Sequence, residues 1–217
     1  MVVEDQIQLM GQRIGAQRFE ALLSRLDDCG SAGDALRLLR SSEFFRGLVE
    51  RQIDWLETEA QFKANTIDYI TAVHERSSAT LQPTEATLMS SLRVLRQRAM
   101  LHILWRSFTQ RATGLDDTLV AMSDLADFVI REAVRFAEAQ VGTRFCEPIG
   151  EDSKTRQHLI VVGMGKLGGR ELNLSSDIDI IFVYDEPGVT EGGSSSTSNQ
   201  EFFTRAAQLV ICLLYTS

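Results

Sequence analysis

Two acidic residues, Asp177 and Asp179, are separated by one isoleucine and followed by the apolar run Ile-Ile-Phe-Val at 180–183. Side chains alternate faces along a β-strand, so both carboxylates are expected on one side while Ile178 faces the core. Carboxylate oxygens are ligands that Mg²⁺ prefers, and two divalent cations can hold the attacking and leaving oxygens of a phosphoryl transfer. The pair predicts a two-metal site, although Asp-x-Asp alone also fits the start of any solvated strand.

A glycine-rich segment lies shortly before this pair, directly after a short apolar run. Gly168 and Gly169 are predicted to open a short helical turn whose backbone N–H groups hold the phosphates of a nucleotide. Glycine suits such a turn because a Cβ would keep phosphate oxygens away from the amides. Lys166 would add a positive charge, and Ser175 or Ser176 could orient a carboxylate or a phosphate.

The same segment also fits a dinucleotide-binding motif. Gly163, Gly165 and Gly168 satisfy G-x-G-x-x-G after a predicted strand, and Asp185 lies where such folds keep their ribose-binding acid. A parallel crossover needs a dozen or more residues, whereas only 170–176 separate the glycines from the next strand. So short a link favours antiparallel neighbours. Only a helix of at least three turns within it would restore the dinucleotide interpretation.

The elements that must position these residues are predicted to be helical up to about residue 150. Apolar residues recur at helical spacing over 19–26, 36–39, 44–62, 67–73, 85–110, 115–142 and again over 201–214. Short β-branched runs predict strands at 158–162 and 178–184, a polar linker precedes them at 147–157, and 191–199 reads as a flexible loop. We therefore expect an α+β fold, with a helical region over 1–150 and a catalytic core containing a mixed sheet over 151–217.

Composition excludes several other classes of protein. Hydrophobic residues make up 44% and charged residues 24% of the 217 residues, as in ordinary globular proteins. The net charge of −8 disfavours nucleic-acid binding, which draws its affinity from neutralised phosphates. The sequence has no apolar run long enough to span a membrane. Its three cysteines are too widely spaced for a zinc site or a disulfide framework, so we expect a cytoplasmic protein.

The Gly-Gly pair followed by Asp-x-Asp among apolar residues resembles the nucleotidyltransferase superfamily to which DNA polymerase beta belongs. The longer string GMGKLGGRELNLSSDIDIIF at 163–182 resembles, more narrowly, the family of bifunctional glutamine synthetase adenylyltransferase/adenylyl-removing enzymes. The resemblance continues upstream through LRVLRQRAMLHILWRSF at 92–108 and MSDLADFVIREAV at 122–134, and covers roughly residues 80–211.

This resemblance implies roles for particular residues. Asp177 and Asp179 would bind Mg²⁺, and Gly168 and Gly169 would position phosphate with Ser176 in support. ATP, ADP or AMP would be substrate or product, and glutamine synthetase and a PII-type signalling protein would be partners. Family members also use a third carboxylate from a later strand. The chain ends before any candidate for it, so we expect the 217-residue chain to be inactive alone.

The resemblance also implies a direction of AMP transfer. The sequence is similar to the N-terminal half of these enzymes, which removes AMP from an adenylylated tyrosine of glutamine synthetase by phosphorolysis, whereas the other half attaches AMP from ATP. Two alternatives stay open: the AMP-attaching activity, and a non-catalytic helical interaction module that retains a nucleotidyltransferase remnant.

Overall fold

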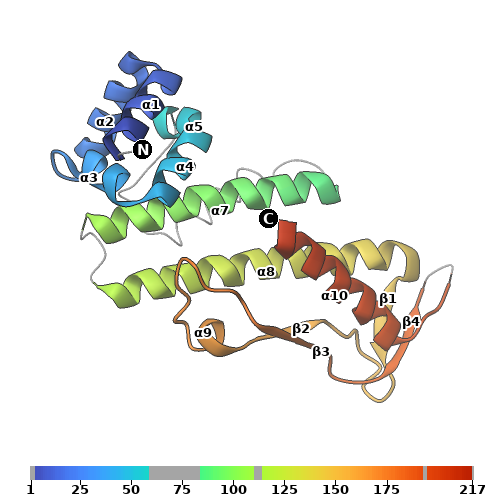
Figure 1. Ribbon diagram of the computed structural model, residues 1–217. Helices are drawn as coiled ribbons and strands as arrows, with labels where there is room; N and C mark the ends of the chain where they lie inside the picture. The colour runs from blue at the N-terminus through green and yellow to red at the C-terminus, as the bar shows by residue number, and fades with distance from the viewer. Residues whose placement is uncertain (1–2, 59–83, 110–113, 193–194, 217) are drawn as a thin grey trace. The chain divides into compact units, whose positions relative to one another are not determined.

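The structure is a computed structural model that describes residues 3–58, 84–109, 114–192 and 195–216. The chain divides into two compact units, Met1–Leu81 with Val94–Met122, and Gln82–Arg93 with Ser123–Ser217. Helices α7 (Glu85–Phe108) and α8 (Leu115–Phe145), both labelled in Figure 1, each contribute residues to the two units. None of the described helices combines the length and the hydropathy that a membrane span requires.

Five short helices lie in the first unit: α1 (Val3–Ile14), α2 (Ala16–Asp28), α3 (Asp34–Ser41), α4 (Glu43–Arg51) and α5 (Ile53–Thr58). Side chains accept N–H groups at the starts of α3 and α4, because the first N–H groups of a helix have no acceptor within it. The Asp27 carboxylate accepts the N–H groups of Gly33 and Ala35 at 2.8 and 3.0 Å, and the Ser42 hydroxyl accepts that of Phe45. The core of this unit includes the buried side chains of Leu22, Leu26, Leu39, Phe45, Leu48, Leu56 and Trp105.

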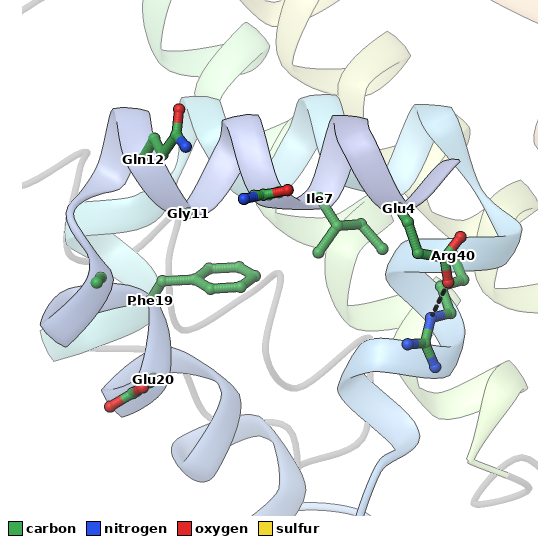
Figure 2. Close-up of a pocket in the computed structure, with 9 residues that line it drawn as sticks. Glu4, Ile7, Gly11, Gln12, Phe19, Glu20 and Arg40 are labelled. Atoms are coloured by element: carbon green, nitrogen blue, oxygen red, sulfur yellow. Dashed lines mark ion pairs between the residues drawn. The ribbon is translucent and has the colours of Figure 1, made fainter. Parts of the chain in front are cut away.

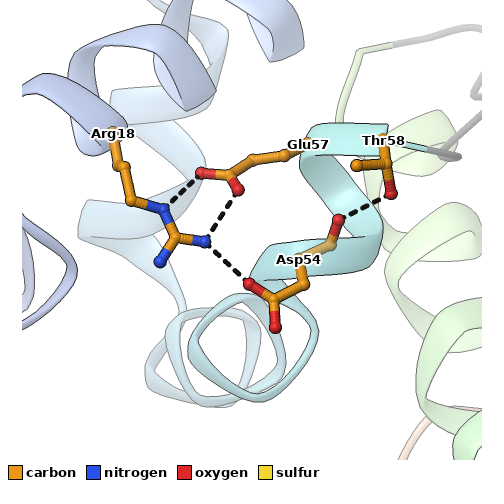
Figure 3. A network of polar contacts seen from close by, with 4 residues as sticks. All are labelled: Arg18, Asp54, Glu57 and Thr58. Carbon is orange, nitrogen blue, oxygen red and sulfur yellow. Dashed lines mark hydrogen bonds and ion pairs between the residues drawn. The ribbon is translucent and has the colours of Figure 1, made fainter.

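One arginine fastens α2 to α5 at the surface (Figure 3). The Arg18 guanidinium donates to both oxygens of Glu57 at 2.9 and 2.7 Å and to Asp54 at 2.7 Å. The hydrogen bonds from Arg18 lower the pKa of the Glu57 carboxyl, and the same bonds raise the pKa of Arg18. This planar fork fixes the orientation of α5 against α2.

A cavity of about 380 Å³ opens beside α1 and α2 (Figure 2). Ile7 and Phe19 provide its apolar walls, and the Glu4–Arg40 ion pair at 3.2 Å borders it from α3. A Cβ on Gly11 would lie 3.2 Å from the Phe19 ring, so glycine lets that ring pack closely against α1. None of the residues predicted to carry chemistry lines this cavity.

The second unit contains two separate two-stranded antiparallel sheets. Strand β1 (Glu147–Gly150) pairs with β4 (Gly188–Glu191), and β2 (Ile160–Gly163) pairs with β3 (Ile180–Val183). A single helical turn, α9 (Gly165–Gly168), follows β2, and α10 (Asn199–Thr216) follows β4.

Helix α10 packs against β1 and β4. Its apolar side is buried through Phe202, Phe203, Ala206, Val210 and Leu213. Its first residue is also fixed, because the Asn199 side-chain amide donates to the Ile149 carbonyl at 3.0 Å. The rings of Tyr184 and Phe203 stack with centroids 5.0 Å apart, so the chain just after β3 also contacts this helix.

The mostly helical α+β architecture is confirmed. The predicted helices at 19–26, 36–39, 85–110, 115–142 and 201–214 correspond to α2, α3, α7, α8 and α10. The stretch predicted as one helix at 44–62 is interrupted at Gln52, between α4 and α5. The helix predicted at 67–73 lies outside the described residues.

Two predictions about the region after residue 145 are wrong. The segment 147–157 is not simply a linker, because residues 147–150 form β1. Gly188 makes this pairing possible, since a Cβ there would lie 2.0 Å from the Ile149 carbonyl oxygen. Both sheets in the described part of the chain are antiparallel, so the expected mixed sheet is not seen there.

Candidate functional site

The candidate site lies in the connection from β2 to β3. The two strands pair in antiparallel register, with Ile160 opposite Val183 and Gly163 opposite Ile180. The connection contains one helical turn of four residues, α9, instead of a crossover helix. The preference for antiparallel neighbours is therefore confirmed, and the dinucleotide-binding interpretation is excluded.

Asp177 and Asp179 come immediately before β3, which begins at Ile180. Exposure alternates along this segment: both aspartates are exposed, whereas Ile178 and Ile180 are half-buried. The Met164 N–H donates to the Asp179 carbonyl at 2.8 Å, which extends the β2–β3 pairing by one step. An alternation of this kind places the two carboxylates on the same open side of the hairpin.

The start of the glycine turn (residues 165–169) lies beside one of these carboxylates. Gly165 has a φ of +51°, and the Asp179 Oδ2 atom is 3.9 Å from the position that a Cβ on Gly165 would take. Among the described residues, the backbone N–H groups of Gly165, Lys166 and Leu167 have no acceptor. Unpaired amides at the start of a helical turn are available to an anionic ligand.

Gly168 and Gly169 close this turn, and the prediction that they open it is wrong. The Gly168 N–H donates to the Met164 carbonyl at 3.2 Å, and the Gly169 N–H donates to the Gly165 carbonyl at 3.0 Å. A Cβ on Gly168 would lie 2.5 Å from the Gly163 carbonyl oxygen. Glycine at 168 therefore allows the turn to approach the end of β2. From the sequence alone, this need for close packing could not be distinguished from a need to bind phosphate.

Lys166 and Ser176 are brought together although ten residues separate them, with Lys166 Nζ 3.3 Å from Ser176 Oγ. Asn173, which the sequence analysis did not select, organises this corner. Its Oδ1 atom accepts from the Ser176 hydroxyl at 2.8 Å, and from the Ser175 N–H and hydroxyl at 3.1 and 3.3 Å. The signal in the sequence was Asn-x-Ser, since asparagine side chains commonly hydrogen-bond the backbone two residues on.

The two other acids near β3 do not join the pair. Asp185 is exposed at the far end of β3. Glu186 accepts the N–H groups of Asp152 and Ser153 at 2.8 and 3.1 Å and the side-chain amide of Gln157 at 3.3 Å. Hydrogen bonds from Ser153 are the main cause that lowers the pKa of the Glu186 carboxyl. Glu186 therefore holds the turn after β1.

The donor set suits a hard cation. No group of three or more His, Cys, Asp or Glu side chains that could hold a metal ion occurs within the described residues. Mg²⁺ commonly takes only one or two protein carboxylates and completes its shell with water and substrate phosphates. Asp177 and Asp179 are both exposed, and Asp179 lies close to Gly165 of the glycine turn, so the pair fits that mode of binding.

A hollow of about 530 Å³ lies between α8 and β2. Ile130 and Val134 of α8 and Val161 of β2 provide apolar lining, and Glu138 accepts the Leu159 N–H at 2.6 Å at its border. Neither Asp177 nor Asp179 lines this hollow. It is therefore separate from the carboxylate pair.

The part of the chain that contains the candidate site also matches known proteins. The sequence model of the family described as glutamate-ammonia ligase adenylyltransferase matches residues 21–217. A bifunctional glutamine synthetase adenylyltransferase/adenylyl-removing enzyme of Ralstonia nicotianae is 38% identical over 176 residues, which cover 80% of this chain and 18% of that protein. The proteins of the same name from Thioalkalivibrio sulfidiphilus and Pseudomonas putida are both 47% identical, over 64% and 62% of this chain and 14% of each relative. The chain thus spans less than a fifth of the length of these relatives.

Proposed function

The chain belongs to the glutamate-ammonia ligase adenylyltransferase family, and we propose that its second unit carries a nucleotidyltransferase site that removes AMP from an adenylylated tyrosine of glutamine synthetase. The observation that carries this proposal is the position of Asp179 Oδ2 close to Gly165 of the glycine turn, with Asp177 exposed two residues earlier on the same side of the hairpin. Removal instead of attachment rests on the resemblance of the string at 163–182 to the N-terminal half of the bifunctional enzymes.

The proposed reaction is phosphorolysis. An oxygen of inorganic phosphate attacks the phosphorus of AMP, the new P–O bond gives ADP, and the bond from phosphorus to the tyrosine oxygen breaks. The tyrosine oxygen leaves as a phenol after taking the proton that the attacking phosphate carried. Charge develops on that oxygen in the transition state, so groups that stabilise negative charge accelerate the step.

The residues of this chain would divide these tasks. Asp177 and Asp179 would hold Mg²⁺, which when bound supplies charge stabilisation to phosphate and leaving-group oxygens. Lys166 and the unpaired N–H groups at the start of the glycine turn would bind phosphate oxygens. Ser176, within reach of Lys166, would fix the direction of its ammonium group. Ser175 and the closing Gly168–Gly169 pair would shape the turn around the nucleotide.

The partners and the setting are part of the same proposal. Glutamine synthetase is the substrate that the names of the relatives print, and a PII-type signalling protein is the proposed regulatory partner. The net charge of −8 supports a protein substrate over a nucleic acid. We place the reaction in the cytoplasm.

Nucleotide binding by the 217-residue chain tests this proposal. Titration with ADP in the presence of Mg²⁺ should show binding that a chelator abolishes and that Asp179→Asn weakens about tenfold or more, a loss of about 1.4 kcal/mol. Asp185→Asn is the matched control, because it removes the same charge from the other end of β3 and should leave binding unchanged. Metal-independent binding, or equal effects of the two variants, would favour a non-catalytic module.

The choice of nucleotide tests the direction of transfer. A site that forms ADP by phosphorolysis should bind ADP with Mg²⁺ more tightly than ATP. A site that attaches AMP from ATP should show the reverse preference, which would overturn the proposed direction while keeping the nucleotidyltransferase assignment.

A further inference from the structure

Arg170, directly after the glycine turn, has an unusual backbone conformation. Its φ is +58°, in the left-handed region that residues with a Cβ rarely adopt. Such a conformation persists only where surrounding contacts hold it. The contacts that hold Arg170 therefore bear on the shape of the turn.

Those contacts come from α8. The Arg170 guanidinium pairs with Asp127 at 3.4 Å and with Asp124, one turn apart on the helix. These carboxylates raise the pKa of Arg170, with the hydrogen bond to Asp124 as the largest cause. Two residues further along, the Leu172 N–H donates to the hydroxyl of Ser123 at 3.3 Å, and both of these side chains are buried. We call Ser123, Asp124 and Asp127 the α8 anchor.

The anchored residues are hydrogen-bonded to the turn itself. The Arg170 N–H donates to the Leu167 carbonyl at 3.1 Å, and the Glu171 N–H donates to the Lys166 carbonyl at 2.7 Å. A shift of Arg170 would therefore move the backbone of Lys166, whose side chain reaches Ser176. It would also disturb the position of the turn beside Asp179.

We propose that the α8 anchor is a set of positioning residues for the nucleotide site, acting through Arg170 and Leu172. This inference rests on the proposed function. It assigns Arg170 to the scaffold: its guanidinium is engaged by two carboxylates, and so it is not the cation that meets a phosphate. That task falls to Lys166.

The two possible roles of Arg170 predict opposite changes in the affinity for ADP with Mg²⁺. In the 217-residue chain, the double variant D124N/D127N should weaken binding of ADP with Mg²⁺ about fivefold or more, because the turn loses its support. If Arg170 were instead a phosphate ligand, freeing it from two carboxylates should leave binding unchanged or tighten it, and that result would overturn the inference.

Substitutions of Arg170 distinguish the effect of its backbone conformation from the effect of its side-chain ion pairs. Arg170→Gly removes the ion pairs but adopts a left-handed backbone without strain, so it should weaken binding, though less than D124N/D127N does. Arg170→Ala loses the ion pairs and keeps the strain, as the double variant does, so its effect should be about as large as that of D124N/D127N. Equal binding by Arg170→Gly and the unsubstituted chain would contradict the anchor.

Hydrogen exchange without nucleotide tests the anchor independently of the proposed function. D124N/D127N should speed exchange of the Arg170 and Glu171 amides about tenfold or more, whereas Glu201→Gln, which breaks the exposed ion pair with Arg205 on α10, should not. Failure of the unsubstituted chain to bind nucleotide would count against the proposed function. Unchanged exchange in the double variant overturns the inference whatever the binding result.

Discussion

Replacing Gly168 by alanine should loosen the contact between the glycine turn and β2. The added Cβ would lie 2.5 Å from the Gly163 carbonyl oxygen and 3.2 Å from its carbonyl carbon. Both are backbone atoms, so relief requires movement of the turn or of the strand. Overpacking of this kind costs about 1–3 kcal/mol. For a chain of this length that corresponds to a fall in Tm of about 2–12 °C.

The neighbouring glycine is the matched control. A Cβ on Gly169 would lie 3.5 Å from the Gly165 carbonyl oxygen, which is an ordinary contact, and its φ of −80° suits any residue. Gly169→Ala should therefore be neutral or stabilise the chain by up to about 1 kcal/mol, because alanine restricts the unfolded state.

Thermal and urea unfolding followed by far-ultraviolet circular dichroism would compare the two variants. We expect a clear loss of stability for Gly168→Ala and none for Gly169→Ala. Equal stability of the two variants would refute the close approach of residue 168 to the end of β2. A large loss in Gly169→Ala alone would show that the Gly-Gly pair lies at the start of the turn instead of at its end.

Two further predictions concern the β1–β4 region. Gly188→Ala would place a Cβ 2.0 Å from the Ile149 carbonyl oxygen, so it should disrupt the pairing and lower the free energy of unfolding by about 2 kcal/mol or more; a Tm equal to that of the unsubstituted chain would argue against this register. The pKa of Glu186 is below its ordinary value of 4.5, mainly because Ser153 donates hydrogen bonds to it. Its contribution to stability is therefore present above that pH and lost as the pH falls through the lowered pKa. In an acid titration of unfolding, Glu186→Gln should remove part of this pH dependence, and an identical profile would count against the hydrogen bonds.

Periodicity in the sequence was enough to predict the long helices and the side on which the aspartates lie. The apolar stripe from residue 115 onward gave α8 almost to its end at Phe145. The two-residue spacing of Asp177 and Asp179 predicted a shared face, and the exposure pattern of the structure agrees with it. The short link before them predicted antiparallel strands, since so few residues cannot form a crossover.

Features that depend on contacts between distant residues were not predictable in this way. Strand β1 has four residues and includes Pro148, so it lacks a β-branched run, and its partner β4 lies about forty residues away in the register. Glycines look alike in a sequence, and only the geometry separates Gly165, which needs a positive φ, from Gly168, which needs space beside Gly163.

The anchor was missed for a similar reason. Arg170 lies 46 and 43 residues from its carboxylate partners, Asp124 and Asp127. Nothing in the spacing of those two acids indicates which arginine they meet. Only the fold brings the helix and the turn together.

Calorimetric titration of Mn²⁺ into the 217-residue chain with bound ADP would test most directly whether the carboxylates of Asp177 and Asp179 form a cation site. We expect saturable binding whose affinity falls about tenfold or more in both Asp177→Asn and Asp179→Asn and stays constant in Asp185→Asn. Undiminished Mn²⁺ affinity in the first two variants would contradict the account, because the cations would then bind elsewhere.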